Sequence, residues 1–533
     1  MSTTLFRGGQ VYSPSEPFAT AVVVEDATIA WVGSDAAAER HLDGMDEIVD
    51  LDGAWLAPAF VDAHVHSTST GLHLSGLDLA GANSLSEALD LLAAAADGHG
   101  DGVLLGHGWD ETTWPEGRPP HRDEIDRAAS GRLVYLSRVD VHSCVASSPL
   151  IALAEHVSAA LGYREDGWLS AEAHHLVRRI ALDSVTVEQR RAAQRVCLDH
   201  AASLGVASLH ELGGPAISGP DDFTDLLTTV GPDSGLEVIG YWGEGGGPDV
   251  ATSLGATGAA GDHFVDGAIG SRTAFLRQRY DDADTRGNAY TSAATICDHV
   301  AACSLAGVQA GYHVIGDGAM DLVVAGFAQA AERVGEEVVR AASHRLEHAE
   351  MVDAPAREVL ARLGVIASVQ PVFDAWWGGD TQMYAERLGV DRARTLNPFA
   401  DLQASGIPLA FGSDAPVTPL APWDALRAAV HHHQPEQRLT PRAAFLAHTR
   451  GGWRAAARRG GTIAVGEPAH LAVWEVDDLV VERPDDRVAA WSTDPRAGVP
   501  GLPSLDLGAK SPRCLRTVAA GRTVYTAGSG RTP

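Results

Sequence analysis

The chain has 533 residues, which is long for a single domain, and its 45% hydrophobic and 21% charged residues are ordinary for a globular protein. Its 70 acidic residues outnumber the 40 basic ones, so the formal net charge is −30. This balance argues against binding to nucleic acid or to an anionic membrane, because both attract a basic surface.

The composition also indicates the compartment. Five cysteines are scattered without a CxxC pair, which is typical of reduced thiols rather than of a disulfide framework. The first residues lack the charged and apolar regions of a secretory signal, and no apolar run reaches the ~20 residues of a membrane span. We therefore expect a cytoplasmic protein.

Both ends of the chain are rich in short β-type runs separated by turn residues. These runs lie at 21–24, 29–33 and 48–51, and again at 463–466, 471–474 and 518–525. Two β-rich ends around a different centre predict a small β-sandwich domain that combines residues 1–57 with residues 462–533.

The centre, residues 58–461, alternates short apolar strands with helical patterns, as βα units do. The candidate strands are 58–66, 206–210, 236–241, 263–266, 308–313, 343–348, 365–370 and 409–414. Eight strands close a TIM barrel, so the predicted fold class is α/β with a (β/α)8 barrel; an open sheet is the alternative.

The first two barrel strands are separated by far more residues than one βα connection needs. We therefore predict an insertion after the first strand, at about 70–175, which forms a cap above the catalytic face. Insertions of this kind commonly build the walls of a substrate pocket.

Residues with metal-binding chemistry stand at the ends of several predicted strands. His64 and His66 are two apart, so they share one face of the first strand, and neutral imidazole is a common metal ligand. Later strands end on His313, His348 and Asp414. Because the reactive residues of a TIM barrel sit at the carboxyl ends of its strands, these side chains should meet at one mouth and form a metal site.

Five segments carry a resemblance to a known family, at residues 58–66, 265–274, 313–319, 345–348 and 412–417. In residue type, order and spacing the chain resembles the amidohydrolase superfamily. Within it, the chain is most similar to amidohydrolase family 3, the branch of YtcJ-like proteins and N-substituted formamide deformylase. The resemblance spans almost the whole chain, but it does not specify a substrate.

The resemblance implies a divalent metal, of the zinc type, and a role for each ligand. His64 and His66 would hold a buried ion, and His313 and His348 would hold a second one. Asp414 would contact the metal and the attacking water, first as general base and then as acid. This is chemically coherent, because a bound cation acidifies water and a neighbouring carboxylate can take the proton.

The chain departs from the family at one position. Many relatives carry a lysine that bridges two metals once it is carboxylated, and Asp262 stands in its place here. The only lysine, Lys510, lies near the C-terminus, so a carboxylated-lysine bridge is excluded. Either Asp262 bridges two ions, or one ion is held by His64, His66, one further histidine and Asp414. We favour one ion per chain.

Several other residues are candidates for substrate binding. Asp266 and Arg272 either orient the substrate or form a loop ion pair. Trp109 and His142 lie in insertion segments that resemble the family's cavity walls. Arg345 precedes His348 on the same predicted strand, and its role stays open.

The leading hypothesis is a metal-dependent hydrolase of a non-peptide C–N bond, in an amide, formamide or cyclic amide. A deaminase of a heterocyclic amine is the nearest enzymatic alternative, and a non-catalytic binding or regulatory relative is the alternative from another class. The expected partner is a small molecule, with neither nucleic acid nor membrane, and a homodimer is the default assembly.

Overall fold

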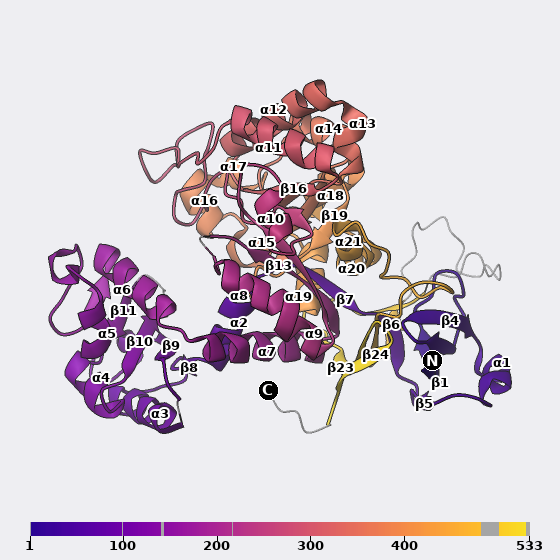
Figure 1. The fold of residues 1–533 in the computed structure, drawn as a ribbon, viewed down its shortest axis with the longest axis horizontal. Helices are drawn as coiled ribbons and strands as arrows, with labels where there is room; N and C mark the ends of the chain where they lie inside the picture. The colour runs from indigo at the N-terminus through magenta and orange to yellow at the C-terminus, as the bar shows by residue number, and fades with distance from the viewer. Residues whose placement is uncertain (1, 99, 140–142, 216, 481–499, 529–533) are drawn as a thin grey trace. The chain divides into compact units, whose positions relative to one another are not determined.

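The computed structural model describes residues 2–98, 100–139, 143–215, 217–480 and 500–528 (Figure 1). The chain divides into two compact units, one made of Met1–His66 with Leu198–Pro533 and the other of Ser67–Cys197. The second unit begins directly after His66 and extends beyond the interval of about 70–175 predicted for the insertion. Among the described residues, no helix has the length and apolarity needed to cross a membrane.

The first unit contains an eight-stranded parallel sheet in the order β19-β18-β17-β16-β15-β14-β13-β7. Its strands are β7 (Phe60–Val65), β13 (Val206–Gly213), β14 (Glu237–Trp242), β15 (Gly258–Ala259), β16 (Gln309–Val314), β17 (Arg345–His348), β18 (Ile366–Val369) and β19 (Leu409–Phe411). The two edges meet where Asp414 N donates to His64 O at 2.8 Å and His66 N donates to Ala415 O at 3.0 Å. The predicted α/β fold class and TIM barrel are confirmed.

One barrel strand lies elsewhere than the sequence predicted. The segment 263–266 is not a strand, although Phe264 forms a single bridge with His313. The strand is instead β15, which pairs with Tyr241 and with β16. Its residues are small and have low β propensity, so the hydrophobic pattern does not reveal it. Gly258 is needed there, because a Cβ would lie 2.8 Å from Gln309 O.

Helices cover the barrel between its strands, as the alternating pattern predicts (Figure 1). In chain order they are α8 (Pro220–Asp225), α9 (Gly231–Ser234), α10 (Asp249–Ser253), α11 (Ala293–Ala306), α12 (Asp317–Val334), α13 (Glu336–Ala341), α14 (Ala354–Arg362), α15 (Pro371–Trp377), α16 (Met383–Leu388), α17 (Val390–Ala393), α18 (Phe399–Ala404), α19 (Pro422–Val430), α20 (Pro441–Ala447) and α21 (Arg450–Ala455).

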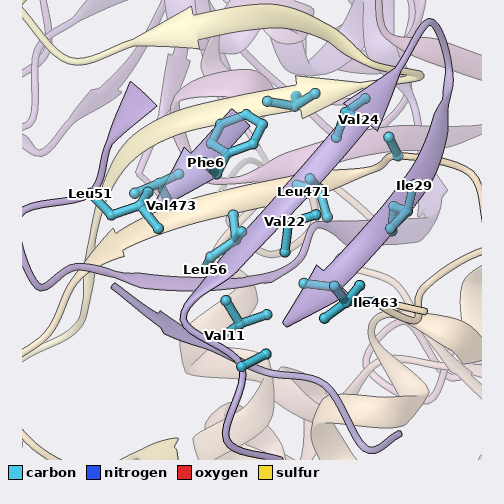
Figure 2. Packing of buried hydrophobic residues seen from close by; sticks show 14 residues of the cluster. Phe6, Val11, Val22, Val24, Ile29, Leu51, Leu56, Ile463, Leu471 and Val473 are labelled. Atoms are coloured by element: carbon cyan, nitrogen blue, oxygen red, sulfur yellow. The ribbon is translucent and has the colours of Figure 1, made fainter. Parts of the chain in front are cut away.

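Two small sheets in the first unit are built from the ends of the chain, and the second of them combines strands from both termini. One has the order β4-β3-β1-β5 and the other β2-β6-β20-β23-β24. Their strands are β1 (Thr3–Arg7), β2 (Gln10–Val11), β3 (Ala21–Glu25), β4 (Thr28–Gly33), β5 (Glu47–Asp50), β6 (Trp55–Pro58), β20 (Leu471–Glu475), β23 (Arg513–Ala519) and β24 (Arg522–Thr526). Figure 2 shows the apolar core that they share, in which Phe6 and Val22 pack with Leu471 and Val473. Residues 463–466 are not a strand, but Ile463 belongs to this core.

The second unit has its own sheet, in the order β12-β11-β10-β9-β8, and its own apolar core. Its elements are α2 (Ser67–Ser75), β8 (Leu77–Asp78), α3 (Leu85–Gly98), β9 (Val103–Trp109), α4 (Arg122–Ala128), β10 (Leu133–Arg138), β11 (Ser143–Ala146), α5 (Ser148–Leu153), β12 (Trp168–Ser170), α6 (Ala171–Asp183) and the start of α7 (Val187–Ser203). This unit therefore folds around side chains of its own.

Candidate metal centre

Strand β7 delivers the first two histidines. All six of its residues are buried, as expected for a barrel strand, and His64 and His66 share a face because side chains alternate. Asp62 Oδ1 accepts hydrogen bonds from His64 N at 3.2 Å and Ser413 N at 2.9 Å. These bonds tie the end of β7 to the segment that carries Asp414.

Two histidines and two aspartates converge at the carboxyl end of the barrel. The Nε2 atom of His64 lies 3.3 Å from Asp414 Oδ1 and 3.6 Å from Asp262 Oδ1. The Nε2 atom of His66 lies 3.2 Å from Asp414 Oδ1 and 3.2 Å from Asp262 Oδ2. The Nε2 atom of each histidine thus lies within 3.6 Å of an oxygen of each aspartate.

The remaining predicted ligands lie beside this centre. His348 Nε2 lies 3.9 Å from Asp262 Oδ1, and the His313 ring centroid lies 4.4 Å from that of His348. Two groups of three have ligand atoms within 4.8 Å of one another, His64–His66–Asp262 and His64–His348–Asp414. His313 belongs to neither group, and both groups use His64.

The outer nitrogen atoms of three histidines are held by hydrogen bonds. The Nδ1 atom of His64 pairs with Glu347 Oε2 at 3.0 Å, and that of His66 donates to the Leu212 carbonyl at 3.0 Å. The Nδ1 atom of His348 pairs with Gln370 Oε1 at 2.8 Å. Such partners hold the proton on Nδ1 and leave the Nε2 lone pair for a cation, which is how metal-binding histidines are usually oriented.

The charges of the centre fit a divalent cation. Burial disfavours a charged imidazole, yet the carboxylates of Asp414 and Asp262 raise the pKa of His64 well above its usual value. Against the opposing effect of burial, the imidazoles hold the pKa of Asp262 and of Asp414 below their usual range. His64 Nε2 and Asp262 Oδ1 are buried and make no hydrogen bond among the described residues. A cation bound by these nitrogen and oxygen atoms would supply positive charge to the two carboxylates.

A buried ion pair contacts His64 at its Nδ1 atom. Glu347 accepts hydrogen bonds from Arg345 Nε at 2.6 Å and from Arg345 Nη2 at 3.0 Å. The side chains of His64, Arg345 and Glu347 are fully buried. Burial opposes the charged carboxyl, but Arg345 and His64 lower the pKa of Glu347 to about 2. Arg345 also donates to the Ala63 carbonyl and to His210 Nδ1, at 2.7 and 3.0 Å. Arg345 was a substrate-binding candidate; the structure places it inside the barrel, where its partners are protein groups.

Two further substrate-binding candidates hold the loop after β15 together. Asp266 is fully buried and accepts backbone N–H groups of Phe275, Ile315 and Gly316, at 2.8, 3.0 and 2.8 Å. Burial raises the pKa of Asp266 to about 7 against these hydrogen bonds. Arg272 forms a two-pronged ion pair with Asp282, so the loop ion pair does not involve Asp266. The structure brings neither side chain into the four-residue centre.

The second unit contains two of the predicted substrate-binding residues, Trp109 and His142. Trp109 is fully buried in the core of that unit, and its indole N–H donates to the Leu136 carbonyl at 2.9 Å. In this structure its side chain serves packing and is closed to a ligand. His142 lies outside the described residues.

Sequence reasoning missed the residues that orient the ligands, namely Asp62, Glu347 and Gln370. Glu347 carried one usable signal: it stands two residues after Arg345, so the two share a strand face. By the same alternation, His348 should face away from the centre. It reaches the centre because the strand ends there, with a φ of 68° at His348.

This barrel and its candidate ligands are typical of metal-dependent hydrolases, and comparison with known proteins agrees with that class. An amidohydrolase family model matches residues 47–525. Protein LONG AFTER FAR-RED 3 of Arabidopsis thaliana is 27% identical over 502 residues, which cover 85% of this chain and 83% of that protein. The putative amidohydrolase YtcJ of Bacillus subtilis is 27% identical over 466 residues, which cover 80% and 83%.

Solved structures show the same architecture. An uncharacterized metal-dependent hydrolase from Pyrococcus furiosus superposes with a TM-score of 0.74 at 27% identity, covering 88% of this chain and 98% of that one. The chain belongs to the amidohydrolase family, as the sequence motifs indicated. Membership implies a hydrolase that uses a divalent metal.

Proposed function

We propose that the protein hydrolyses a non-peptide C–N bond of a small molecule, in an amide, formamide or cyclic amide. The observation that carries the proposal is that the Nε2 atoms of His64 and His66 each lie within 3.6 Å of an oxygen of Asp262 and of an oxygen of Asp414 at the barrel mouth. These four residues would hold the cation, and nitrogen and carboxylate ligands of this kind suit zinc. A divalent cation bound there acidifies water and polarises a carbonyl oxygen.

The arrangement around His64 supports a single ion. Its Nδ1 atom is engaged by Glu347, so it offers one ligand atom, Nε2, and both groups of potential ligands share that atom. We therefore propose one tightly held ion per chain. Asp262 would be a direct ligand of this ion rather than a bridge between two ions.

Asp414 is the proposed proton carrier. Its carboxylate lies against the Nε2 atoms of both β7 histidines, and its low pKa keeps it ionised at neutral pH. In that state it can accept the proton of the attacking water and return it to the leaving nitrogen.

The test is a substrate panel assayed with the metal-loaded protein, whose metal content is measured on the same sample. Amides, formamides and cyclic amides should release an amine with a carboxylate or formate, and D414N should lower kcat by roughly 10²–10⁴-fold when it is reloaded to the metal content of the parent protein. D321N is a matched control, because Asp321 is half-exposed and pairs with Arg277 on the surface. Ammonia release from heterocyclic amines alone would replace this proposal with deamination, and two ions per fully active chain would contradict the single centre.

A further inference from the structure

Positive charge is concentrated in one stretch of this acidic chain. Residues 438–466 contain six arginines and no aspartate or glutamate, although acidic residues outnumber basic ones by 70 to 40 overall. Four of the six, Arg450, Arg454, Arg458 and Arg459, lie on helix α21 or just after it, and all four are exposed. The local charge is therefore opposite in sign to that of the whole protein.

These four arginines line one pocket of about 390 Å³, together with Thr462 and Glu467. Helix α21 forms one wall, and the segment 460–467 forms the other. Gly461 makes this close approach possible: its φ is 72°, and a Cβ there would lie 2.4 Å from Arg450 N. The backbone conformation at this position thus shapes the pocket.

Two of the four guanidinium groups have no carboxylate partner. Arg458 pairs with Glu237, and Arg459 donates to Glu467 at 2.6 Å. Within the described part of the chain, Arg450 and Arg454 make neither an ion pair nor a side-chain hydrogen bond. They are four residues apart on a helix, so their side chains project from the same face. Two uncompensated positive charges therefore border the pocket.

A second pocket of about 370 Å³ adjoins the first one and is also lined by Arg450 and Arg454. Its other walls include Ile407, Leu409 and Leu446. A ligand held between the two guanidinium groups could thus place an apolar part against these side chains.

The paired pockets lie at the end of the barrel opposite the metal centre. A Cβ at Gly451 would lie 2.3 Å from the Leu409 carbonyl, at the start of β19, and one at Gly452 would lie 2.4 Å from Val61, near the start of β7. His66 and Asp414 follow the carboxyl ends of these same two strands. The arginine site is therefore distinct from the catalytic site.

We propose that this end of the barrel binds a small organic phosphate, with the phosphate between Arg450 and Arg454 and an apolar body against Leu446. Guanidinium groups match the geometry of phosphate oxygens and give charge-assisted hydrogen bonds. The neighbouring apolar wall distinguishes such a ligand from a free inorganic ion. The site goes beyond the proposed hydrolysis, because it uses none of the residues of the metal centre.

The test is isothermal titration calorimetry of the metal-loaded full chain at low salt, with phenyl phosphate, inorganic phosphate and phenol as probes. Phenyl phosphate should bind more tightly than inorganic phosphate, and phenol should not bind. R450Q/R454Q should weaken phenyl phosphate binding by at least roughly tenfold, since hydrogen bonds to charged groups are lost. The control R333Q/R513Q removes the same net charge from exposed arginines elsewhere and should bind as the parent does.

The outcomes separate this site from the metal centre. Equal binding of phenyl phosphate to the parent and to R450Q/R454Q would mean that it binds at another site, such as the metal centre. That result would overturn the proposal. Absence of binding to the parent at millimolar probe would overturn it as well. R454K, which keeps the charge but loses the fork geometry, should weaken binding less than the double variant and serves if the double variant fails to fold.

Discussion

Two arginine–carboxylate pairs in the first unit have the same chemistry and different surroundings. Arg345 and Glu347 are fully buried beneath His64, whereas Arg272 and Asp282 lie in the loop after β15 with side chains 35% and 26% exposed. Arg345 has four further protein contacts besides its carboxylate, including the face of Tyr241 at 4.3 Å. Water can replace the partner of Arg272 if the pair is broken, but it cannot reach Arg345.

This difference sets what each pair contributes. A charge left without its partner inside a protein is strongly destabilising, whereas an exposed pair contributes little and is screened by salt. We infer that the buried pair positions His64, and that the loop pair only restrains its loop. The following variants test this contrast, from the largest expected effect to the smallest.

E347Q should have the largest effect, because it leaves Arg345 buried without a counter-charge and weakens the hold on His64 Nδ1. We expect a loss of about 3–5 kcal/mol in the free energy of unfolding and a 10–100-fold loss of metal affinity, by rough analogy with similar pairs. Denaturant titration and metal competition measure the two effects. The matched control is E475Q, whose pair with Arg513 is exposed; equal destabilisation of both variants would contradict the contrast.

R345K keeps the positive charge but loses the fork that contacts Glu347, the Ala63 carbonyl and His210. We expect an intermediate loss of about 2 kcal/mol, since several buried acceptors lose their donors. The metal affinity should fall less than in E347Q. If R345K were as stable as the parent protein, the fork geometry would have no role.

D266N tests a buried carboxyl in the same loop as Arg272 and Asp282. Its two oxygens accept three backbone N–H groups, and an amide would turn its NH2 group toward at least one of them. We expect a loss of about 1–2 kcal/mol and faster proteolysis of the loop after β15. Limited proteolysis measures the second effect, with D298N as the control, because Asp298 is an exposed carboxyl on helix α11 outside this loop. An unchanged cleavage rate would mean that Asp266 does not restrain the loop.

R272Q should have the smallest effect, below about 1 kcal/mol, because its ion pair is partly exposed. Its small effect should shrink further when salt is raised, and a salt series of thermal midpoints measures this. A large loss of kcat with unchanged stability would instead return Arg272 to the substrate-binding candidates.

The sequence predicted those parts of the molecule that depend on local patterns. Short apolar runs separated by helical patterns predicted seven of the eight barrel strands near their positions. The missed strand, β15, consists of two small residues. The i, i+2 spacing predicted that His64 and His66 share a face. The residue types at the strand ends predicted that Asp414 and His348 lie near that pair, and the structure brings them there.

Other assignments depended on contacts that no local pattern encodes. Glu347 reaches His64 across 283 residues, and Asp62 reaches Ser413 across 351. The placement of the substrate-binding candidates has the same cause: whether Arg345, Asp266 or Trp109 faces a cavity or the core depends on its neighbours in space. A polar residue in a family motif looks the same in the sequence in either case.

By itself, the sequence determined the barrel, the family and the residues available as metal ligands. The succession of strand and helix patterns and the chemistry of each residue are local properties. Its single lysine also excluded a carboxylated-lysine bridge. Only the tertiary structure decided that Asp262 and Asp414 both lie against the Nε2 atoms of His64 and His66, and that the Arg345–Glu347 ion pair contacts His64 Nδ1. Burial and charge pairing arise between segments hundreds of residues apart, so they are fixed only when the barrel closes.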